Sequence, residues 1–174
     1  MPRDWDRHYS DPANVELAPA SLLVEAADLL KPGRALDLAC GAGRNALYLA
    51  GLGWQVTAVD RSAVGIRLLR ERAAGLDVEA HLVDLEAGEF AIAPEAYDLV
   101  CDFYYLQRDL FPAIRAGVRP GGVFAGAIHL AAGKYALQPG ELREEFAGWK
   151  ILFYSEAQEK GRTRRSARIL ARRA

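Results

Sequence analysis

The sequence is poor in cysteine, carries almost no net charge and has no long run of hydrophobic residues. Its 2 cysteines, Cys40 and Cys101, lie in apolar segments, which argues against a disulfide framework or a multi-cysteine zinc site. Lys and Arg number 22 and Asp and Glu number 23, so no general field is present to hold a nucleic-acid backbone. No segment approaches the roughly 18 apolar residues that a membrane span requires. We therefore expect no metal, no membrane and no nucleic-acid partner.

The remaining composition is that of an ordinary globular protein. Of the 174 residues, 51% are hydrophobic and 26% are charged. At roughly 150 residues per domain, this length predicts a single domain over residues 1–174. The N-terminal residues MPRDWDRHYS have no apolar stretch behind their charges, so we expect no signal peptide and a cytoplasmic protein. The oligomeric state cannot be predicted from the sequence.

Helical and strand-like hydrophobic patterns alternate along the chain. Helices are predicted at about 19–30 and 43–52, from a cap at Ser62, from about Asp109, and near 140–147. Strands are predicted at 34–40, 55–60, 78–83, 97–103, 123–130, 149–155 and 164–171. A turn is expected at Arg119-Pro120-Gly121-Gly122.

The order of these elements defines the expected fold class. Nearly continuous apolar strands that alternate with helices are typical of a parallel sheet covered on both faces. The last two strands have no helix between them, which predicts an antiparallel hairpin at one edge. We therefore expect an α/β, doubly wound, Rossmann-like three-layer sandwich with a mainly parallel seven-stranded sheet.

Acidic residues and glycines gather where the first predicted strands end. Gly41 and Gly43 permit a tight turn and a close approach of a ligand to the backbone. Asp60 ends the second strand, where a carboxylate can accept both hydroxyls of a ribose, and Asp84 follows the third strand. Ligands of such sheets bind at the carboxyl ends of the strands. This arrangement predicts a nucleoside site, although solvated strand ends or helix caps would also place acids here.

The glycine spacing is compatible with two kinds of ligand. Gly41-Ala-Gly43-Arg-Asn-Ala46 also fits the dinucleotide fingerprint, whose third glycine can be alanine. Asp37, inside the first strand, would repel a diphosphate but suits a ligand with an ammonium group and a sulfonium. Asp84 adds a further acid. The charge pattern favours an adenosine that carries a cation.

The ordered set of motifs resembles class I S-adenosylmethionine-dependent methyltransferases. It consists of Asp37-Leu-Ala-Cys-Gly-Ala-Gly43, Val56-Thr-Ala-Val-Asp60, Val83-Asp84 and Arg119-Pro-Gly-Gly122. The stretches 44–50 and 137–156 are similar to the small tellurite-resistance and thiopurine-type methyltransferases. Trp5-Asp-Arg-His-Tyr9 resembles the W-x-x-R/H-Y opening of that group. The resemblance divides the domain into an N-terminal lid segment and helix (1–30), a cofactor-binding core (33–130) and C-terminal strands (131–174).

The resemblance implies S-adenosyl-L-methionine as the cofactor, with S-adenosyl-L-homocysteine as its product. Asp37 and the 39–43 backbone would hold the methionine moiety, Asp60 the ribose and Asp84 the adenine amino group. Trp5 and Tyr9 are expected to form a lid, since aromatic faces tolerate a cation. The full predicted cofactor site is Trp5, Tyr9, Asp37, Ala39, Cys40, Gly41, Gly43, Arg44, Asp60, Arg61, Asp84, Leu85, Asp102 and Phe103.

The expected activity is methyl transfer to a small-molecule acceptor by in-line displacement, which depends mainly on proximity and alignment. The signature of amino-directed nucleic-acid methyltransferases is absent after Phe103, which argues against a DNA base. Tellurite, a thiol, a thiopurine-like ring, or a hydroxyl or carboxyl compound all remain possible acceptors. A hydroxyl or amine would need a base, for which His8, Tyr104 and His129 are the main candidates, with no catalytic residue identified.

Two other functions are compatible with the sequence. One is an NAD-type oxidoreductase, supported by the 41–46 spacing alone, and the other is a non-catalytic S-adenosylmethionine-binding protein.

We interpret Cys40 and Cys101 as buried apolar residues and His81 as structural. The basic C-terminal tail is interpreted as a charged edge strand that discourages edge-to-edge pairing, with an anionic substrate or RNA contact as the alternative. Its members are Lys160, Arg162, Arg164, Arg165, Arg168, Arg172 and Arg173.

Overall fold

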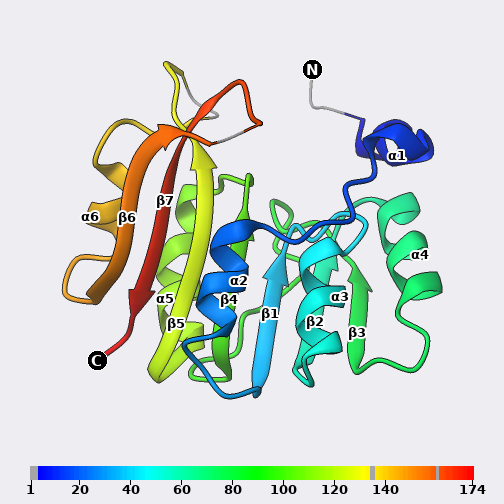
Figure 1. Cartoon of the computed structure of the whole chain (residues 1–174), viewed down its shortest axis with the longest axis horizontal. Helices are drawn as coiled ribbons and strands as arrows, with labels where there is room; N and C mark the ends of the chain where they lie inside the picture. The colour runs from blue at the N-terminus through cyan, green and yellow to red at the C-terminus, as the bar shows by residue number, and fades with distance from the viewer. Residues whose placement is uncertain (1–3, 134–135, 160) are drawn as a thin grey trace. The chain divides into compact units, whose positions relative to one another are not determined.

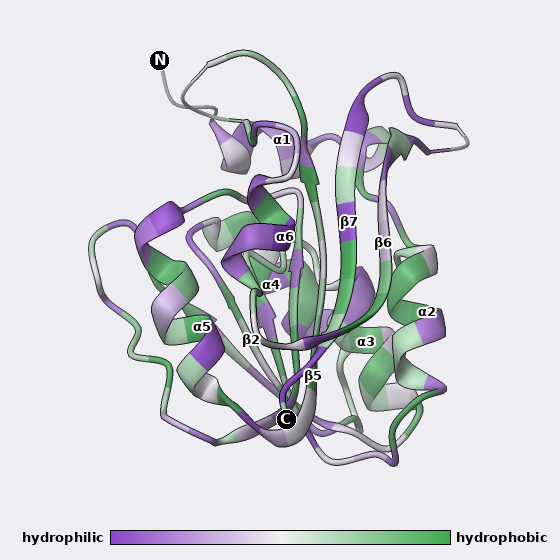
Figure 2. Ribbon diagram, turned by 90° about the vertical axis from the view of Figure 1, so that its left-hand side faces the viewer, coloured by the Kyte–Doolittle hydropathy of each residue, from purple (hydrophilic) through white to green (hydrophobic). Residues whose placement is uncertain are grey.

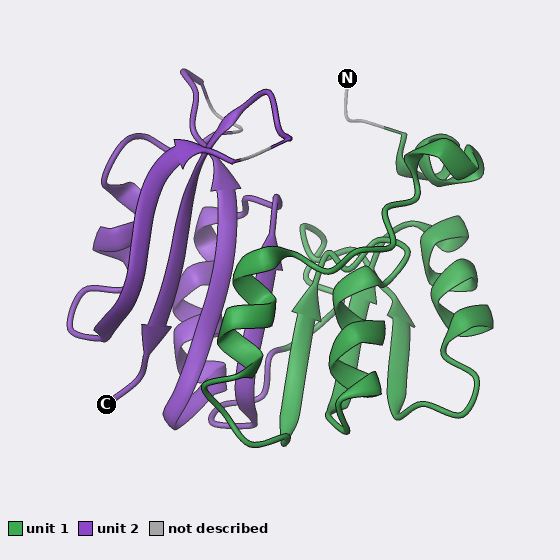
Figure 3. Ribbon diagram, viewed as in Figure 1, with its two compact units in different colours: residues 1–91 green, residues 92–174 purple. Residues whose placement is uncertain are grey.

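The computed structural model of the chain describes residues 4–133, 136–159 and 161–174 (Figure 1). Lys160 of the basic tail and residues 134–135 of the predicted C-terminal segment lie outside the described residues. The chain forms two compact units, residues 1–91 and 92–174 (Figure 3). The two units are described separately, and the prediction of a single domain stays a prediction.

The first unit contains a parallel β-α-β-α-β arrangement preceded by short helices. Its elements are α1 (Trp5–Ser10), a 3-10 helix η1 (Pro12–Asn14), α2 (Ser21–Ala27), β1 (Arg34–Leu38), α3 (Arg44–Gly51), β2 (Gln55–Asp60), α4 (Ala63–Arg72) and β3 (Val78–Leu82). Strand β2 pairs in parallel with β1 on one side and β3 on the other. The carboxyl ends of the three strands therefore meet at one edge, where ligands of such sheets bind.

Burial and local capping explain where the strands and helices of this unit begin and end. In β1 every residue after Arg34 is buried, and β2 is buried at its last three residues. Helix α2 is shorter than predicted, because the chain after Asp28 leaves the helix before Pro32 and Gly33. Helix α4 begins at the predicted cap, where the Ser62 hydroxyl accepts a hydrogen bond from the Gly65 amide at 3.0 Å.

The second unit contains β4 (Tyr97–Phe103), a 3-10 helix η2 (Arg108–Leu110), α5 (Phe111–Gly117), β5 (Val118–His129), α6 (Glu141–Glu145), β6 (Lys150–Gln158) and β7 (Arg165–Arg172). Strands β4 and β5 are parallel, whereas β7 is antiparallel to both β5 and β6. The strand order is β3-β2-β1-β4-β5-β7-β6. The predicted fold class, an α/β fold with a mainly parallel seven-stranded sheet and an antiparallel C-terminal hairpin, is confirmed.

Two local predictions in this unit are wrong. The turn predicted at 119–122 is an irregularity inside β5, because Val118 pairs with Tyr97 and the register resumes where Val123 pairs with Leu99. The basic strand β7 is not an edge strand, because it lies between β5 and β6, which leaves β6 at the edge. A hydrophilic band separates hydrophobic parts of β7 in Figure 2. The basic residues here need another explanation than protection of an edge.

Several arginines of the tail are engaged within the second unit. The guanidinium of Arg162 lies 4.3 Å from the centre of the Tyr104 ring, and that of Arg168 lies 5.4 Å from the Phe153 ring. Arg165 donates to the Glu156 carbonyl at 3.0 Å, and Arg173 pairs with Glu95 at 3.0 Å. These contacts give the basic residues local structural roles.

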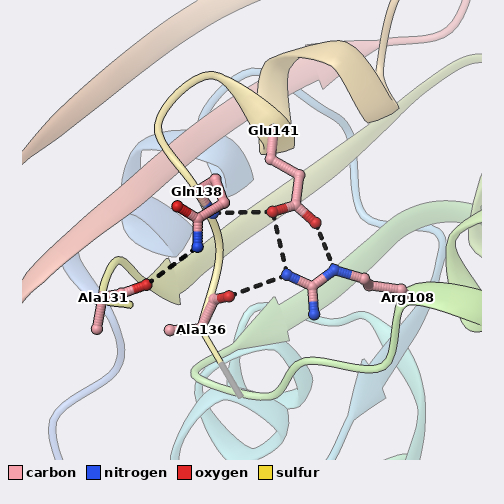
Figure 4. A network of polar contacts seen from close by, with 5 residues as sticks. All are labelled: Arg108, Ala131, Ala136, Gln138 and Glu141. Carbon is pink, nitrogen blue, oxygen red and sulfur yellow. Dashed lines mark hydrogen bonds and ion pairs between the residues drawn. The ribbon is translucent and has the colours of Figure 1, made fainter. Parts of the chain in front are cut away.

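A network around Arg108 joins η2 to the start of α6 (Figure 4). Its guanidinium binds both carboxylate oxygens of Glu141, with N–O distances of 2.5 and 3.1 Å, and donates to the Ala136 carbonyl at 2.9 Å. Glu141 also accepts from the Gln138 amide at 2.8 Å. Arg108 is the principal cause that lowers the pKa of Glu141. The network therefore links η2 to the described residues Ala136 and Gln138, which precede α6.

None of the helices in the described part of the chain has the length and apolar character needed to traverse a bilayer. The same residues hold no group of three or more His, Cys, Asp or Glu side chains arranged to bind a metal ion. Cys40 and Cys101 are both buried, as interpreted from the sequence. Burial raises the pKa of Cys40 well above its usual value, so this thiol is a poor nucleophile.

Candidate cofactor site

The loop after β1 has a backbone conformation that allows a ligand to approach it closely. Ala39, Gly41 and Gly43 have φ angles of +50°, +57° and +83°. Glycine adopts this left-handed region freely, but a side chain such as that of Ala39 is strained there. The loop is tied to β2 by the Cys40 amide, which donates to the Val59 carbonyl at 3.0 Å. Alternate left-handed residues thus turn the chain sharply between β1 and α3.

Asp60 connects this loop to the end of β2. One carboxylate oxygen accepts from the Gly41 amide at 2.8 Å, and the other accepts from the Ser62 amide at 2.7 Å. The residue is 8% exposed, and burial raises its pKa above the usual value against the opposing effect of these hydrogen bonds. Each carboxylate oxygen has further lone-pair capacity, so Asp60 can still accept from the hydroxyls of a ligand.

Asp37 is buried beneath the same loop, at 1% exposure. Its carboxylate accepts from the Ala46 amide at 3.1 Å, in the first turn of α3. Burial raises the pKa of Asp37 to about 7, while Arg44 acts to lower it. Asp37 therefore combines a structural contact to α3 with a titration near neutral pH, a combination that is frequent at functional sites.

Helix α1 brings both predicted lid residues to this region. The Tyr9 ring lies against Gly41 and Gly65, since a Cβ added to Gly41 would overlap the Tyr9 hydroxyl and one added to Gly65 would lie 3.3 Å from the ring. Trp5 stacks on Tyr9 with ring centres 6.0 Å apart, and His8 meets both rings edge-on. His8 is thus an aromatic partner within α1.

A pocket of about 380 Å³ opens beside α1 and the ends of β2 and β3. This volume lies in the range of small-molecule sites, which is about 300–1,000 Å³. Two predicted site residues besides Trp5 line it, namely Arg61 and Asp84. The remaining lining residues are Asp4, Asp6, Ser62, Ala63, Leu82, Val83 and Glu89. Its excess of carboxylates favours a neutral or cationic ligand over a diphosphate.

The other predicted residues of this unit have mainly structural contacts. Asp84 accepts from the Glu86 amide at 2.9 Å, while its own amide donates to Glu89 at 2.8 Å. Leu85 is buried next to it. Arg44 forms an ion pair with Glu16 and donates to the Ala18 carbonyl at 3.4 Å. These contacts order the loops around the pocket.

The second unit carries the remaining predicted residues at the ends of β4 and β5. Asp102 and Phe103 are buried in the last two positions of β4. Tyr104 follows with a φ of +70°, stacks on His129 at 5.0 Å and donates its hydroxyl hydrogen bond to Glu159 at 2.7 Å. Tyr104 and Tyr105 are both half-buried.

The sequence did not indicate Asp6 or Glu89 as site residues, although both line the pocket. Ser62 was predicted as a helix cap alone, but its hydroxyl also donates to Asp6 at 2.6 Å. An acid between two predicted lid residues is the signal that could have identified Asp6. Glu89 lies in a loop without periodicity, so no pattern indicates it.

This geometry defines a class of protein. A glycine loop after the first strand, a buried acid at the end of the second and an antiparallel C-terminal hairpin define the class I S-adenosylmethionine-dependent methyltransferase fold. The chain belongs to the TehB family, because the model described as "Tellurite resistance protein TehB" matches residues 5–169.

Individual relatives agree with this assignment. The structure is similar to that of TehB from Haemophilus influenzae, with a TM-score of 0.79, 26% identity, and coverage of 98% of this chain and 67% of that chain. A probable S-adenosyl-L-methionine-dependent methyltransferase TehB from Haemophilus influenzae is 29% identical over 77% of this chain and 52% of the relative. Hemagglutinin 1 of Eikenella corrodens is 33% identical over 79% of this chain and 50% of the relative. The chain thus spans about half the length of these two curated relatives.

Proposed function

We propose that this protein transfers a methyl group from S-adenosyl-L-methionine to a small-molecule acceptor. The observation that carries the proposal is Asp60, a buried carboxylate that joins the glycine loop to the wall of an acid-lined pocket. The cofactor supplies an activated methyl group on a sulfonium centre. The residues present fit this ligand, because they combine ribose acceptors, a closely approachable loop and carboxylates for its cationic part.

Each residue of the first unit has a distinct task in the proposed site. Asp60 would accept from the ribose hydroxyls, and the loop 39–43 with Asp37 would hold the methionine part. Asp84 would accept from the adenine amino group at the pocket wall. Trp5 and Tyr9 would cover the site and exclude water, while Arg44, held by Glu16, would lie near the methionine carboxylate. These tasks concern binding and orientation, which in-line displacement chiefly requires.

Tyr104 and His129 are the candidates for the acceptor side. Burial, Arg164 and Arg162 lower the pKa of His129, so its imidazole is neutral at pH 7 and can accept a proton. A relative supports a small acceptor, namely a ubiquinone biosynthesis O-methyltransferase of Burkholderia orbicola that is 34% identical over 69% of this chain. A soft acceptor such as a thiol or reduced tellurium would need no base, whereas a hydroxyl would use His129.

Thermal unfolding with excess ligand tests the cofactor. A ligand at about 100 times its dissociation constant stabilises the folded state by about 2.7 kcal/mol, which raises the Tm by about 5–11 °C. We expect this rise with S-adenosylmethionine and S-adenosylhomocysteine and none with NADH. A rise with NADH alone would support an oxidoreductase and overturn the proposal. Binding without turnover across a screen of thiol, chalcogen and hydroxyl acceptors would instead favour a non-catalytic binding protein.

The affinity for S-adenosylmethionine is expected to increase as the pH rises through about 7, because the ionised form of Asp37 binds its ammonium group. Below that pKa, each pH unit should weaken binding by up to about tenfold. The stability of the free protein depends on pH in the opposite direction. The raised pKa of Asp37 makes the folded state bind more protons than the unfolded state. Its free energy of unfolding should therefore fall between about pH 4 and about pH 7.

Calorimetric titration across this pH range, together with chemical denaturation, measures both trends. The Asp37→Asn variant keeps an acceptor for the Ala46 amide and removes the titration, so both trends should flatten. An identical pH dependence in the wild type and Asp37→Asn would show that another group is responsible.

A further inference from the structure

Helix α1 is joined to the N-terminus of α4 through the carboxylate of Asp6. One Asp6 oxygen accepts from the Ser62 hydroxyl at 2.6 Å and from the Val64 amide at 3.1 Å. Asp6 and Ser62 are 56 residues apart in the sequence. Asp6 therefore acts as a cap that α1 supplies to a helix elsewhere in the same unit.

The N-terminus of α4 explains why this contact is favourable. The first amides of a helix have no partner within the helix and attract negative charge. Ser62 satisfies the Gly65 amide at 3.0 Å, and its hydroxyl proton is then directed to Asp6. Asp6 satisfies the Val64 amide in addition. These hydrogen bonds also lower the pKa of Asp6, so the carboxylate is ionised at neutral pH.

The position of α1 depends on such contacts. With 6 residues, α1 is far shorter than a helix that is stable alone in water. Helix α1 supplies the aromatic part of the candidate site, with Trp5 on the pocket wall and Tyr9 against Gly41 and Gly65. A change that releases α1 from α4 would therefore remove both aromatic side chains from the site together.

We propose that Asp6 is a positioning residue that holds Trp5 and Tyr9 over the cofactor site by capping α4 from α1. This inference rests on the proposed function. Asp6 acts through the two aromatic residues, and the population of docked α1 sets the apparent affinity for the cofactor. If docking falls, the apparent dissociation constant rises by the inverse of the docked fraction.

Three variants measure this effect by calorimetric titration with S-adenosylhomocysteine. Asp6→Ala should raise the dissociation constant about 3- to 10-fold, the range expected for loss of a helix cap. Asp6→Asn keeps one acceptor oxygen and should recover most of the affinity. Asp11→Asn removes the same charge from an exposed residue of the same segment that does not line the pocket, and should bind as the wild type does.

A double-variant cycle separates positioning from a general structural role. In a Trp5→Ala/Tyr9→Ala background, Asp6→Ala should have almost no further effect on the dissociation constant, because nothing remains for Asp6 to position. An undiminished effect of Asp6→Ala in that background would overturn the inference.

Amide hydrogen exchange of the ligand-free protein gives a readout that does not need the cofactor. Asp6→Ala should accelerate exchange at Val64 and throughout α1, whereas Asp11→Asn should leave Val64 unchanged. If the wild type binds no S-adenosylhomocysteine, the proposed function fails, while unchanged exchange at Val64 would refute the Asp6 anchor itself. If the wild type binds and Asp6→Ala binds equally well, the inference is wrong and the proposed function stands.

Discussion

Replacing Asp60 with alanine is expected to raise the dissociation constant for S-adenosylhomocysteine by about 100-fold or more. Two charge-assisted hydrogen bonds to a ribose would be lost, each contributing about 1.5–3 kcal/mol. The substitution also removes the acceptor of the Gly41 and Ser62 amides, so the loop after β1 loses its connection to β2. Calorimetric titration below the Tm of the variant measures the affinity, and circular dichroism confirms that the protein is folded.

Two further variants separate the ligand contact from the effect on folding. Asp60→Asn retains one acceptor oxygen, so we expect a loss of affinity of about tenfold. Asp77→Ala removes a carboxylate from an exposed residue just before β3 and should change the free energy of unfolding by no more than about 0.5 kcal/mol. A folded Asp60→Ala protein that binds within about threefold of the wild type would exclude Asp60 from the cofactor site.

The elements with continuous hydrophobic patterns are those that could be predicted from the sequence. Strands β2 and β4 have the predicted bounds, because each is a short segment rich in apolar residues with clear ends. The cap of α4 was predicted at Ser62, since a serine before a helical pattern supplies an acceptor for the first amides. Local chemistry is sufficient for such features.

Features that depend on pairing between distant segments could not be predicted. The position of β7 between β5 and β6 depends on which strand pairs with β5, and hydrophobic periodicity contains no such information. Arg44 fits a carboxylate ligand by its place in the sequence, but the structure shows its partner to be Glu16, 28 residues earlier. Asp6 is likewise exposed, and its contact with α4 becomes visible only in three dimensions.

Gly65 gives the sharpest test of how such distant contacts shape the site, because helix propensity and packing predict opposite results. In an ordinary helix, replacing glycine with alanine stabilises by about 0.8–1.0 kcal/mol. At Gly65 in α4, however, an added Cβ would lie 2.9 Å from the Gly41 carbonyl oxygen and 3.3 Å from the Tyr9 ring. Gly41 cannot retreat freely, since its amide is held by Asp60 at 2.8 Å. We therefore expect Gly65→Ala to destabilise the protein by about 1–3 kcal/mol.

The same substitution should weaken cofactor binding by about tenfold, since the glycine loop and Tyr9 are displaced together. Gly51→Ala is the matched control, because Gly51 is also helical but an added Cβ there would meet nothing within 4 Å. This control should be stabilised by up to about 1 kcal/mol and bind normally. Chemical denaturation and calorimetric titration compare the two variants. If Gly65→Ala behaves like Gly51→Ala, the contact of α4 with the glycine loop does not constrain the site; opposite signs would show that the missing side chain at Gly65 is what lets α4, Tyr9 and the loop meet.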